Sequence, residues 1–189
     1  MGLSWNELPP DFLTEPFNAL FRRVSFADAL AICRYAGTSQ TLVLLDKNAE
    51  KEAQEHLRLC PVEAGGLLLG KTYVNAGEIA SPLKFIVAIQ ACICAKDAQG
   101  TPTALRMEPH LWTQANNQRQ SDEFVVGWFH SHPNLGAFFS GTDRRTQASF
   151  FGDPHKLGWV VDPHRKEEAW FSGGDSVEIP PKMIVRGYF

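Results

Sequence analysis

The chain has 189 residues, of which 44% are hydrophobic and 21% charged, a balance typical of a globular protein rather than a disordered one. Its formal net charge is -3 and no run of Lys or Arg exceeds two residues, so nucleic acid is not an expected partner. No apolar stretch approaches the roughly 18 residues of a membrane helix, and the N-terminus lacks the pattern of a signal peptide. We therefore expect a cytoplasmic protein that makes no membrane contact.

The cysteines favour the same compartment. None of the four belongs to a CxxC pair, so the sequence predicts no disulfide framework. Cys92 and Cys94 flank Ile93 in a strand-like run, which points both thiols to one face and disfavours a bond between them. Buried free thiols in a reducing cytoplasm are the favoured interpretation.

Residues 1–40 are punctuated by proline and then show helical spacing, so we interpret them as a helical extension before a domain over residues 41–189. Helical spacing first appears at Phe17, Leu20 and Phe21, and a second helical stretch is expected at Ser25–Tyr35. The apolar residues that imply a buried face are Phe17, Leu20, Phe21, Leu30 and Ile32. This face either packs on the core or docks a partner. We favour packing, because the arginines of this segment would keep the opposite face in water.

From Thr41 onward, short apolar runs with strand character alternate with helical patterns. The expected strands are Thr41–Leu45, Gly65–Tyr73, Phe85–Ala95, Phe124–His132, Leu157–Asp162, Glu168–Phe171 and Lys182–Val185. The expected helices are Ala49–Cys60, preceded by capping side chains at Asp46–Asn48, then Leu111–Arg119 and Asp143–Phe151. Strands outnumber helices and the connections vary in length. The expected fold class is therefore α/β, with a mixed β-sheet flanked by helices.

One segment carries metal-binding chemistry. His130 and His132 are two residues apart in an expected strand, so both imidazoles project from one face toward one ion. Ser140 and Asp143 have capping-box spacing, which places Asp143 in the first turn of the next helix. Two imidazole nitrogens and a carboxylate oxygen form the ligand set of a catalytic zinc and leave a position for water. We predict one zinc ion per chain, held by His130, His132 and Asp143.

A hydrolase of this type also needs a base. Glu63 lies between the end of an expected helix and the apolar strand that starts at Gly65. Burial at that point would raise the pKa of its carboxyl toward the range useful for proton transfer. Taken alone, Glu63 would be read as a helix-end glutamate that points into water.

Together, Glu63, His130-Ser131-His132-Pro133 and Ser140-x-x-Asp143 resemble the JAMM (MPN-plus, or JAB) zinc metalloprotease family. The resemblance covers about Thr41–Phe171, and the residues around Asp143 are most similar in character to the proteasome-lid deubiquitinase subgroup. It implies an MPN/JAB-like fold whose mixed sheet is partly barrel-like. The chain carries no zinc-finger insertion and no appended ubiquitin-binding motif, so we expect a small, stand-alone prokaryotic member.

The resemblance implies hydrolysis of peptide or isopeptide bonds at the C-terminus of a ubiquitin-like protein, as deconjugation or as precursor processing. Glu63 would deprotonate the attacking water and protonate the leaving amine, and Ser140 would donate a hydrogen bond to the developing oxyanion. The implied partners are ubiquitin-like proteins or their conjugates, whose tail lies along a sheet edge, and E1-like or E2-like enzymes of the same pathway.

Two alternatives remain open. The chain is either such an isopeptidase or a peptidase that acts on sulfur-carrier proteins or small peptides, and the zinc site does not separate these. A non-catalytic MPN scaffold is less favoured, because every ligand position is filled.

Phe138 and Phe139 either line the substrate channel or fill the core. The remaining histidines lack ligand spacing, with His56 on a helix and His110, His155 and His164 in loops.

Overall fold

The computed structural model describes residues 14–35, 39–95 and 109–188, and this part of the chain forms one mixed sheet of nine strands. The strands are β1 (Thr14–Pro16), β2 (Thr41–Leu45), β3 (Gly65–Val74), β4 (Phe85–Cys94), β5 (Phe124–Ser131), β6 (Leu157–Asp162), β7 (Glu167–Ser172), β8 (Val177–Ile179) and β9 (Ile184–Arg186). The helices are α1 (Phe17–Phe21), α2 (Phe26–Cys33), α3 (Lys47–Leu59), α4 (Pro109–Gln118) and α5 (Gly141–Phe150), with a 3-10 turn at Pro181–Met183.

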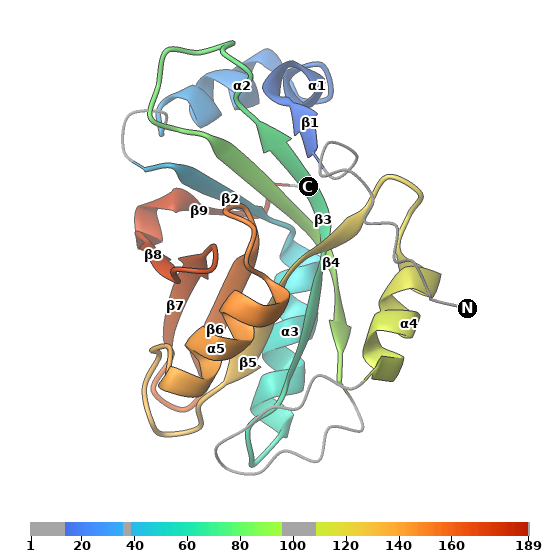
Figure 1. Cartoon of the computed structure of the whole chain (residues 1–189), viewed down its shortest axis with the longest axis vertical. Helices are drawn as coiled ribbons and strands as arrows, with labels where there is room; N and C mark the ends of the chain where they lie inside the picture. The colour runs from blue at the N-terminus through green and yellow to red at the C-terminus, as the bar shows by residue number, and fades with distance from the viewer. Residues whose placement is uncertain (1–13, 36–38, 96–108, 189) are drawn as a thin grey trace, which may run out of the picture.

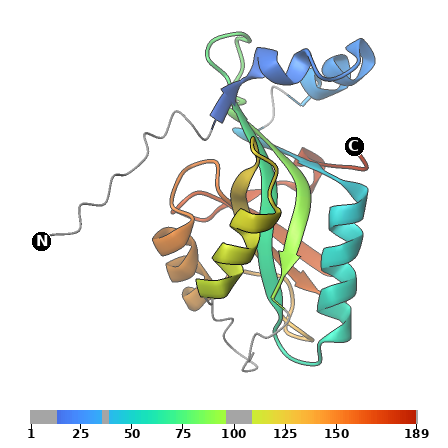
Figure 2. The same ribbon diagram turned by 90° about the vertical axis from the view of Figure 1, so that its right-hand side faces the viewer.

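The sheet curls strongly, as Figure 1 shows, and its main path runs β8-β7-β6-β5-β3-β4-β2-β9. Helix α3 lies on one side of β3 and β4, and α4 and α5 lie on the other side (Figure 2). This arrangement confirms the expected mixed sheet flanked by helices. No helix in the described ranges is long and apolar enough to cross a membrane.

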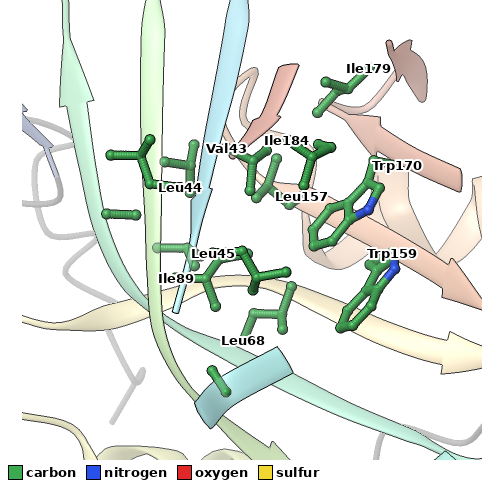
Figure 3. Packing of buried hydrophobic residues seen from close by; sticks show 14 of the residues in the cluster. Val43, Leu44, Leu45, Leu68, Ile89, Leu157, Trp159, Trp170, Ile179 and Ile184 are labelled. Carbon is green, nitrogen blue, oxygen red and sulfur yellow. The ribbon is translucent and has the colours of Figure 1, made fainter. Parts of the chain in front are cut away.

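Two apolar cores lie on the two faces of the sheet, because alternate residues of a strand point to opposite faces. On β3, Leu68 packs into the core that includes α3, whereas Leu67 and Leu69 pack into the core that includes α4. All five residues of β2 are buried. Figure 3 shows the first core, which contains Leu45 of β2, Ile89 of β4 and Leu68 of β3 together with Trp159 and Trp170. Complete burial of one such side chain contributes about 1.5–3 kcal/mol.

The N-terminal segment contributes a strand as well as helices. Strand β1 pairs in parallel with β3, with Thr14 opposite Thr72, which the helical interpretation did not predict. The predicted packing on the core is confirmed for Phe17, Leu20 and Ile32, which are all buried in the first core. It is wrong for Leu30, which is 52% exposed. Residues two apart on a helix face different directions, so Leu30 and Ile32 cannot both face the sheet.

Other local predictions need correction. The expected strand Lys182–Val185 begins instead as the 3-10 turn Pro181–Met183, because proline fixes φ and lacks an N–H for a sheet ladder. His110 lies in the first turn of α4 rather than in a loop. Strand β8 was missed, since three residues are too few for a periodic pattern.

None of the four cysteines forms a disulfide bond, but only two match the expected burial. Cys92 and Cys94 are buried, Cys60 is half-buried, and Cys33 is exposed on the surface. The prediction of buried thiols is therefore wrong for Cys33.

Candidate active site

Strand β5 carries the two candidate histidine ligands to the end of the sheet. It lies between β3 and β6, with Gly65 and Val160 opposite His130 on its two sides. His132 follows the last residue of the strand, and its N–H donates to the carbonyl of Val161 over 2.9 Å. This bond extends the strand geometry by one residue, so the two imidazoles stay on the same face. Their ring centroids are 4.8 Å apart.

Helix α5 brings the third ligand candidate by means of its N-terminal cap. The Asp143 N–H donates to the Ser140 hydroxyl over 3.2 Å, and the Ser140 N–H donates to Asp143 Oδ2 over 2.6 Å. This reciprocal capping box confirms the predicted position of Asp143 in the first turn. Because the backbone holds its carboxylate, Asp143 faces the end of β5 in a fixed orientation.

The three candidate ligands converge on one point, and they fit a zinc ion. The Nε2 atoms of His130 and His132 are 3.1 Å apart, and Asp143 oxygens lie 3.2 Å from the first and 3.4 Å from the second. Neighbouring ligands at 2.0–2.1 Å from a tetrahedral ion are roughly 3.3 Å apart. All three residues are buried. The spacing, the burial and the donor types match what a zinc site requires.

The charges of this group are strongly coupled. Burial by itself raises the pKa of Asp143, but hydrogen bonds from His130 and His132 outweigh it and hold that pKa well below its usual range. Burial lowers the pKa of His130, which favours the neutral imidazole that binds metal. Burial also disfavours the charged form of His132, but the Asp143 and Glu63 carboxylates raise its pKa overall. A permanent carboxylate thus faces two imidazoles.

Glu63 occupies the position that the base hypothesis requires. It is 5% exposed, and its Oε1 lies 3.8 Å from His132 Nε2. Burial raises its pKa to about 7, with a smaller contribution from the Asp143 charge and an opposing one from His132. A helix-end glutamate in water would be exposed and acidic, so that interpretation is wrong. The carboxyl is poised to exchange a proton near neutral pH.

Ser131 ties the base to the ligands, a role that the sequence analysis did not assign. Its N–H donates to the Ala64 carbonyl over 2.8 Å, and its hydroxyl accepts from the Ala64 N–H over 3.1 Å. Ser131 is fully buried and stands between the two histidines in sequence, and Ala64 follows Glu63. These two bonds hold the backbone of Glu63 against the end of β5.

Aromatic and amide side chains next to the ligands connect strand β5 to helix α5. Trp128 stacks on His130, and its indole N–H donates to Gln147 Oε1 over 2.7 Å. Gln147 is fully buried on α5, one turn after Asp143, and donates to the carbonyls of Phe151 and Lys156. The amide therefore fixes α5 against the strand that carries the histidines.

A second buried carboxylate holds the loop that follows His132. Asp162 is fully buried at the end of β6 and accepts from the N–H groups of Asn134 and Gly136, at 3.2 and 2.8 Å. It also accepts from the N–H groups of His164 and Arg165. Burial opposes the charge, but these bonds keep the pKa of Asp162 below its usual value. No periodic pattern predicted this contact.

Phe138 and Phe139, in the loop after His132, were expected either to line the substrate channel or to fill the core, and the structure places them differently. Phe139 is buried and stacks on Phe171 with ring centroids 4.0 Å apart, so it fills the core. Gly158 makes room for it, since a Cβ there would lie 2.3 Å from the Phe139 ring. Phe138 is 48% exposed, and its ring centroid is 5.1 Å from that of His132. It borders the site.

The structure brings together all five residues singled out from the sequence: Glu63, His130, His132, Ser140 and Asp143. His155 and His164 lie in turns, as expected, and His56 lies on α3. None of these three joins the group of His130, His132 and Asp143.

Sequence comparisons relate the chain to a known family. The family of prokaryotic homologs of the JAB domain matches residues 46–172. COP9 signalosome complex subunit 5 of Debaryomyces hansenii is 41% identical over 115 residues, which cover 57% of this chain and 22% of that protein. 26S proteasome non-ATPase regulatory subunit 14 of Drosophila melanogaster is 50% identical over 66 residues, covering 34% and 21%. NAD(+) hydrolase TcpA of a Theionarchaea archaeon is 33% identical over 105 residues, covering 55% and 28%.

A solved structure supports the fold. The solution structure of a protein from Desulfitobacterium hafniense matches with a TM-score of 0.56 and 24% identity, covering 77% of this chain and 92% of that one. The curated relatives are much longer, and the matched segments span between about a fifth and a little over a quarter of their lengths. The family match covers well over half of the chain, from the start of α3 to the end of β7. The chain belongs to the prokaryotic JAB-domain family.

Proposed function

We propose that the chain is a zinc-dependent metallopeptidase that hydrolyses peptide or isopeptide bonds at the C-terminus of a ubiquitin-like protein. The observation that carries this proposal is the juxtaposition of a buried Glu63, with its raised pKa, and a three-ligand metal set that it nearly touches. A metal site with a structural role alone has no use for a carboxyl poised near neutrality. Proton transfer during hydrolysis requires one.

His130, His132 and Asp143 would hold the ion. A zinc ion there supplies Lewis-acid chemistry, which acidifies a water molecule and polarises a carbonyl group. The chain itself supplies the orientation of its ligands. The capping box fixes Asp143, and stacking on Trp128 fixes His130.

Glu63 moves the proton in this mechanism. As a carboxylate it accepts a proton from the attacking water, and as the acid it delivers that proton to the leaving amine. A pKa of about 7 suits both steps, because neither form is strongly preferred at neutral pH. The backbone bonds between Ala64 and Ser131 keep the carboxyl beside the ligands.

Ser140 is the proposed oxyanion donor. Its hydroxyl oxygen already accepts from the Asp143 N–H, so its own proton remains available for a hydrogen bond outward. The residue is half-buried at the start of α5 and is adjacent to the ligand set through Asp143. The loss of one such donor typically costs about 3 kcal/mol of transition-state stabilisation.

Exposed apolar side chains that are close in sequence to the site residues support an extended tail as the substrate. Leu59 and Val62 precede Glu63 and are 73% and 36% exposed, and Leu135 and Phe138 follow His132 and are 52% and 48% exposed. Exposed apolar side chains of this kind are typical of a binding surface. Their position fits the C-terminal tail of a ubiquitin-like protein or of its conjugates, with E1-like or E2-like enzymes as further proposed partners. A sulfur-carrier protein has the same kind of tail and remains the alternative substrate.

We place this activity in the cytoplasm. None of the four cysteines forms a disulfide bond, which is the usual state of thiols in a reducing compartment.

The test uses the full chain, loaded with zinc, and a panel of amides. Ubiquitin with a C-terminal fluorogenic amide, ubiquitin dimers and a sulfur-carrier protein with a C-terminal extension are incubated with it, and products are identified by mass spectrometry. We expect cleavage after the C-terminal residue of one of these tails and none in the Glu63→Gln variant. Cleavage of the sulfur carrier alone would select the alternative substrate. Intact substrates throughout, with zinc bound, would favour a non-catalytic scaffold.

A further inference from the structure

A second group of metal-ligating side chains lies on the opposite face of the sheet from the candidate active site. The carboxylate of Glu52 and the thiols of Cys92 and Cys94 all lie within 4.8 Å of one another. Cys92 and Cys94 pack in the core that contains α3, whereas the intervening Ile93 packs in the core on the other face, where Trp128 of β5 also lies. Since His130 is two residues beyond Trp128 on β5, it shares that other face.

The topology explains why these groups meet. Strand β2 pairs with β4 only as far as Ile89, opposite Leu45, so the last residues of β4 have no neighbouring strand on that side. Helix α3 begins immediately after β2 and runs beside this end of β4. The Cys92 thiol therefore reaches the backbone of the helix, with its sulfur 3.6 Å from the Ala49 carbonyl oxygen. Glu52 is exposed on the same helix, and its carboxylate lies within 4.8 Å of both thiols.

The chemistry of this group suits a cation. Two thiols and a carboxylate within 4.8 Å of one another would crowd negative charge if they ionised alone. A bound cation displaces the thiol protons and compensates that charge.

We propose that Glu52, Cys92 and Cys94 form a second metal site, for a thiolate-binding cation such as Zn²⁺. Two thiolates and one carboxylate oxygen are ligands that zinc accepts, and thiolates strongly favour zinc or softer ions over Mg²⁺ and Ca²⁺. Glu52 is exposed, so water completes the coordination from the solvent side. The ion would join α3 to β4. The site shares no residue with the proposed active site, and its failure would leave the proposed function untouched.

Cadmium is the probe, because its bonds to thiolates give an ultraviolet charge-transfer absorption that histidine and carboxylate ligands do not give. Titration of the full chain is expected to produce this absorption, with an intensity that corresponds to about one thiolate-bound ion per chain. The Cys92→Ser/Cys94→Ser double variant should lose it. Cys33→Ser, which alters the exposed thiol on α2, should keep it, and so should His130→Ala/His132→Ala. An absorption that needs Cys33, or that vanishes with the two histidines, would overturn the proposal.

Glu52 offers a test that does not depend on the packing of the core. Glu52→Ala changes an exposed side chain and should weaken cadmium binding by at least about tenfold, while Glu55→Ala on the same helix should not. Zinc analysis of the His130→Ala/His132→Ala protein should still find about one ion per chain, and the further substitution Glu52→Ala should lower that zinc content when zinc is limiting. Equal cadmium affinity in the Glu52 and Glu55 variants, or no zinc without the histidines, would show that these residues form no metal site.

Discussion

The indole of Trp128 lies flat on the imidazole of His130, with ring centroids 4.5 Å apart and planes 5° from parallel. Metal-binding histidines are usually oriented by a hydrogen bond from the second ring nitrogen. His130 Nδ1 is buried and has no hydrogen-bond partner among the described residues. Stacking on Trp128 and contact with Phe139, at a centroid distance of 6.0 Å, therefore take over the orienting role.

Removal of the stacking ring should weaken metal binding. Trp128→Leu leaves His130 free to rotate, and we expect zinc affinity, measured by competition with a chelating dye, to fall about tenfold or more. Trp128→Phe keeps a flat ring and should lose much less. Trp170, stacked on Trp159 away from the site, provides the control as Trp170→Leu, which should lower stability without a comparable change in zinc affinity. Equal affinities in the two Trp128 variants would show that stacking does not orient His130.

Glu63→Gln should abolish turnover and preserve the fold and the metal. The amide matches the carboxylate in shape but cannot accept a proton, and Glu63 is not one of the three residues expected to hold the ion. We expect kcat to fall at least ~10²-fold with zinc content and melting temperature nearly unchanged. Rates are measured on the substrate identified in the amide panel. Near-normal turnover would place the base elsewhere.

Zinc should be removable by strong chelators, since three protein ligands leave an open position. Chelation is expected to abolish hydrolysis and to lower the melting temperature, because an ion that binds only the folded state stabilises it. Added Zn²⁺ should restore both, and the Asp143→Ala variant, which lacks one ligand, should show a smaller shift at the same zinc concentration. An enzyme that is fully active with no detectable metal would contradict the proposed mechanism.

The parts of the site that depend on local patterns were predictable from the sequence. Alternation along a strand placed His130 and His132 on one face, and capping-box spacing placed Asp143 in the first turn of α5. Glu63 was expected to be buried, and it is. Each of these inferences used either residues that are close together in sequence or the resemblance to the motif of a known family.

The supporting contacts were not predictable, because they join residues far apart in sequence. Asp162 holds Gly136, which is 26 residues earlier, and Ser131 holds Ala64, which is 67 residues earlier. Such long separations produce no periodic pattern in the sequence, and both contacts depend on how the strands of the sheet are paired. The same holds for β1, which pairs with β3 through only three residues and ends at Pro16, the N-cap of α1.

Stability should depend on pH through His155. Burial lowers its pKa to about 4 in the folded state, against about 6.5 in the unfolded chain. The unfolded chain therefore binds more protons between these values, and stability is lost as the pH falls from about 6.5 toward 4. Urea unfolding at pH 7.5 and pH 4.5 should show that His155→Asn loses about 2 kcal/mol less than the wild type. The exposed His164→Gln control should follow the wild type, and identical losses in both variants would refute the assignment.

The N-terminal segment should stabilise the domain through Phe17. Its side chain is fully buried in the core that contains α3 and lies near Phe21, at a centroid distance of 6.2 Å. Truncation to alanine leaves a cavity, so Phe17→Ala should lower the free energy of unfolding by about 3–5 kcal/mol. Phe26, 84% exposed on α2, provides a matched control, and Phe26→Ala should change stability by less than about 0.5 kcal/mol. Chemical denaturation measures both, and substrate cleavage is assayed below the transition. A Phe17→Ala protein with unchanged stability but weaker binding of its protein substrate would instead make this segment a docking element.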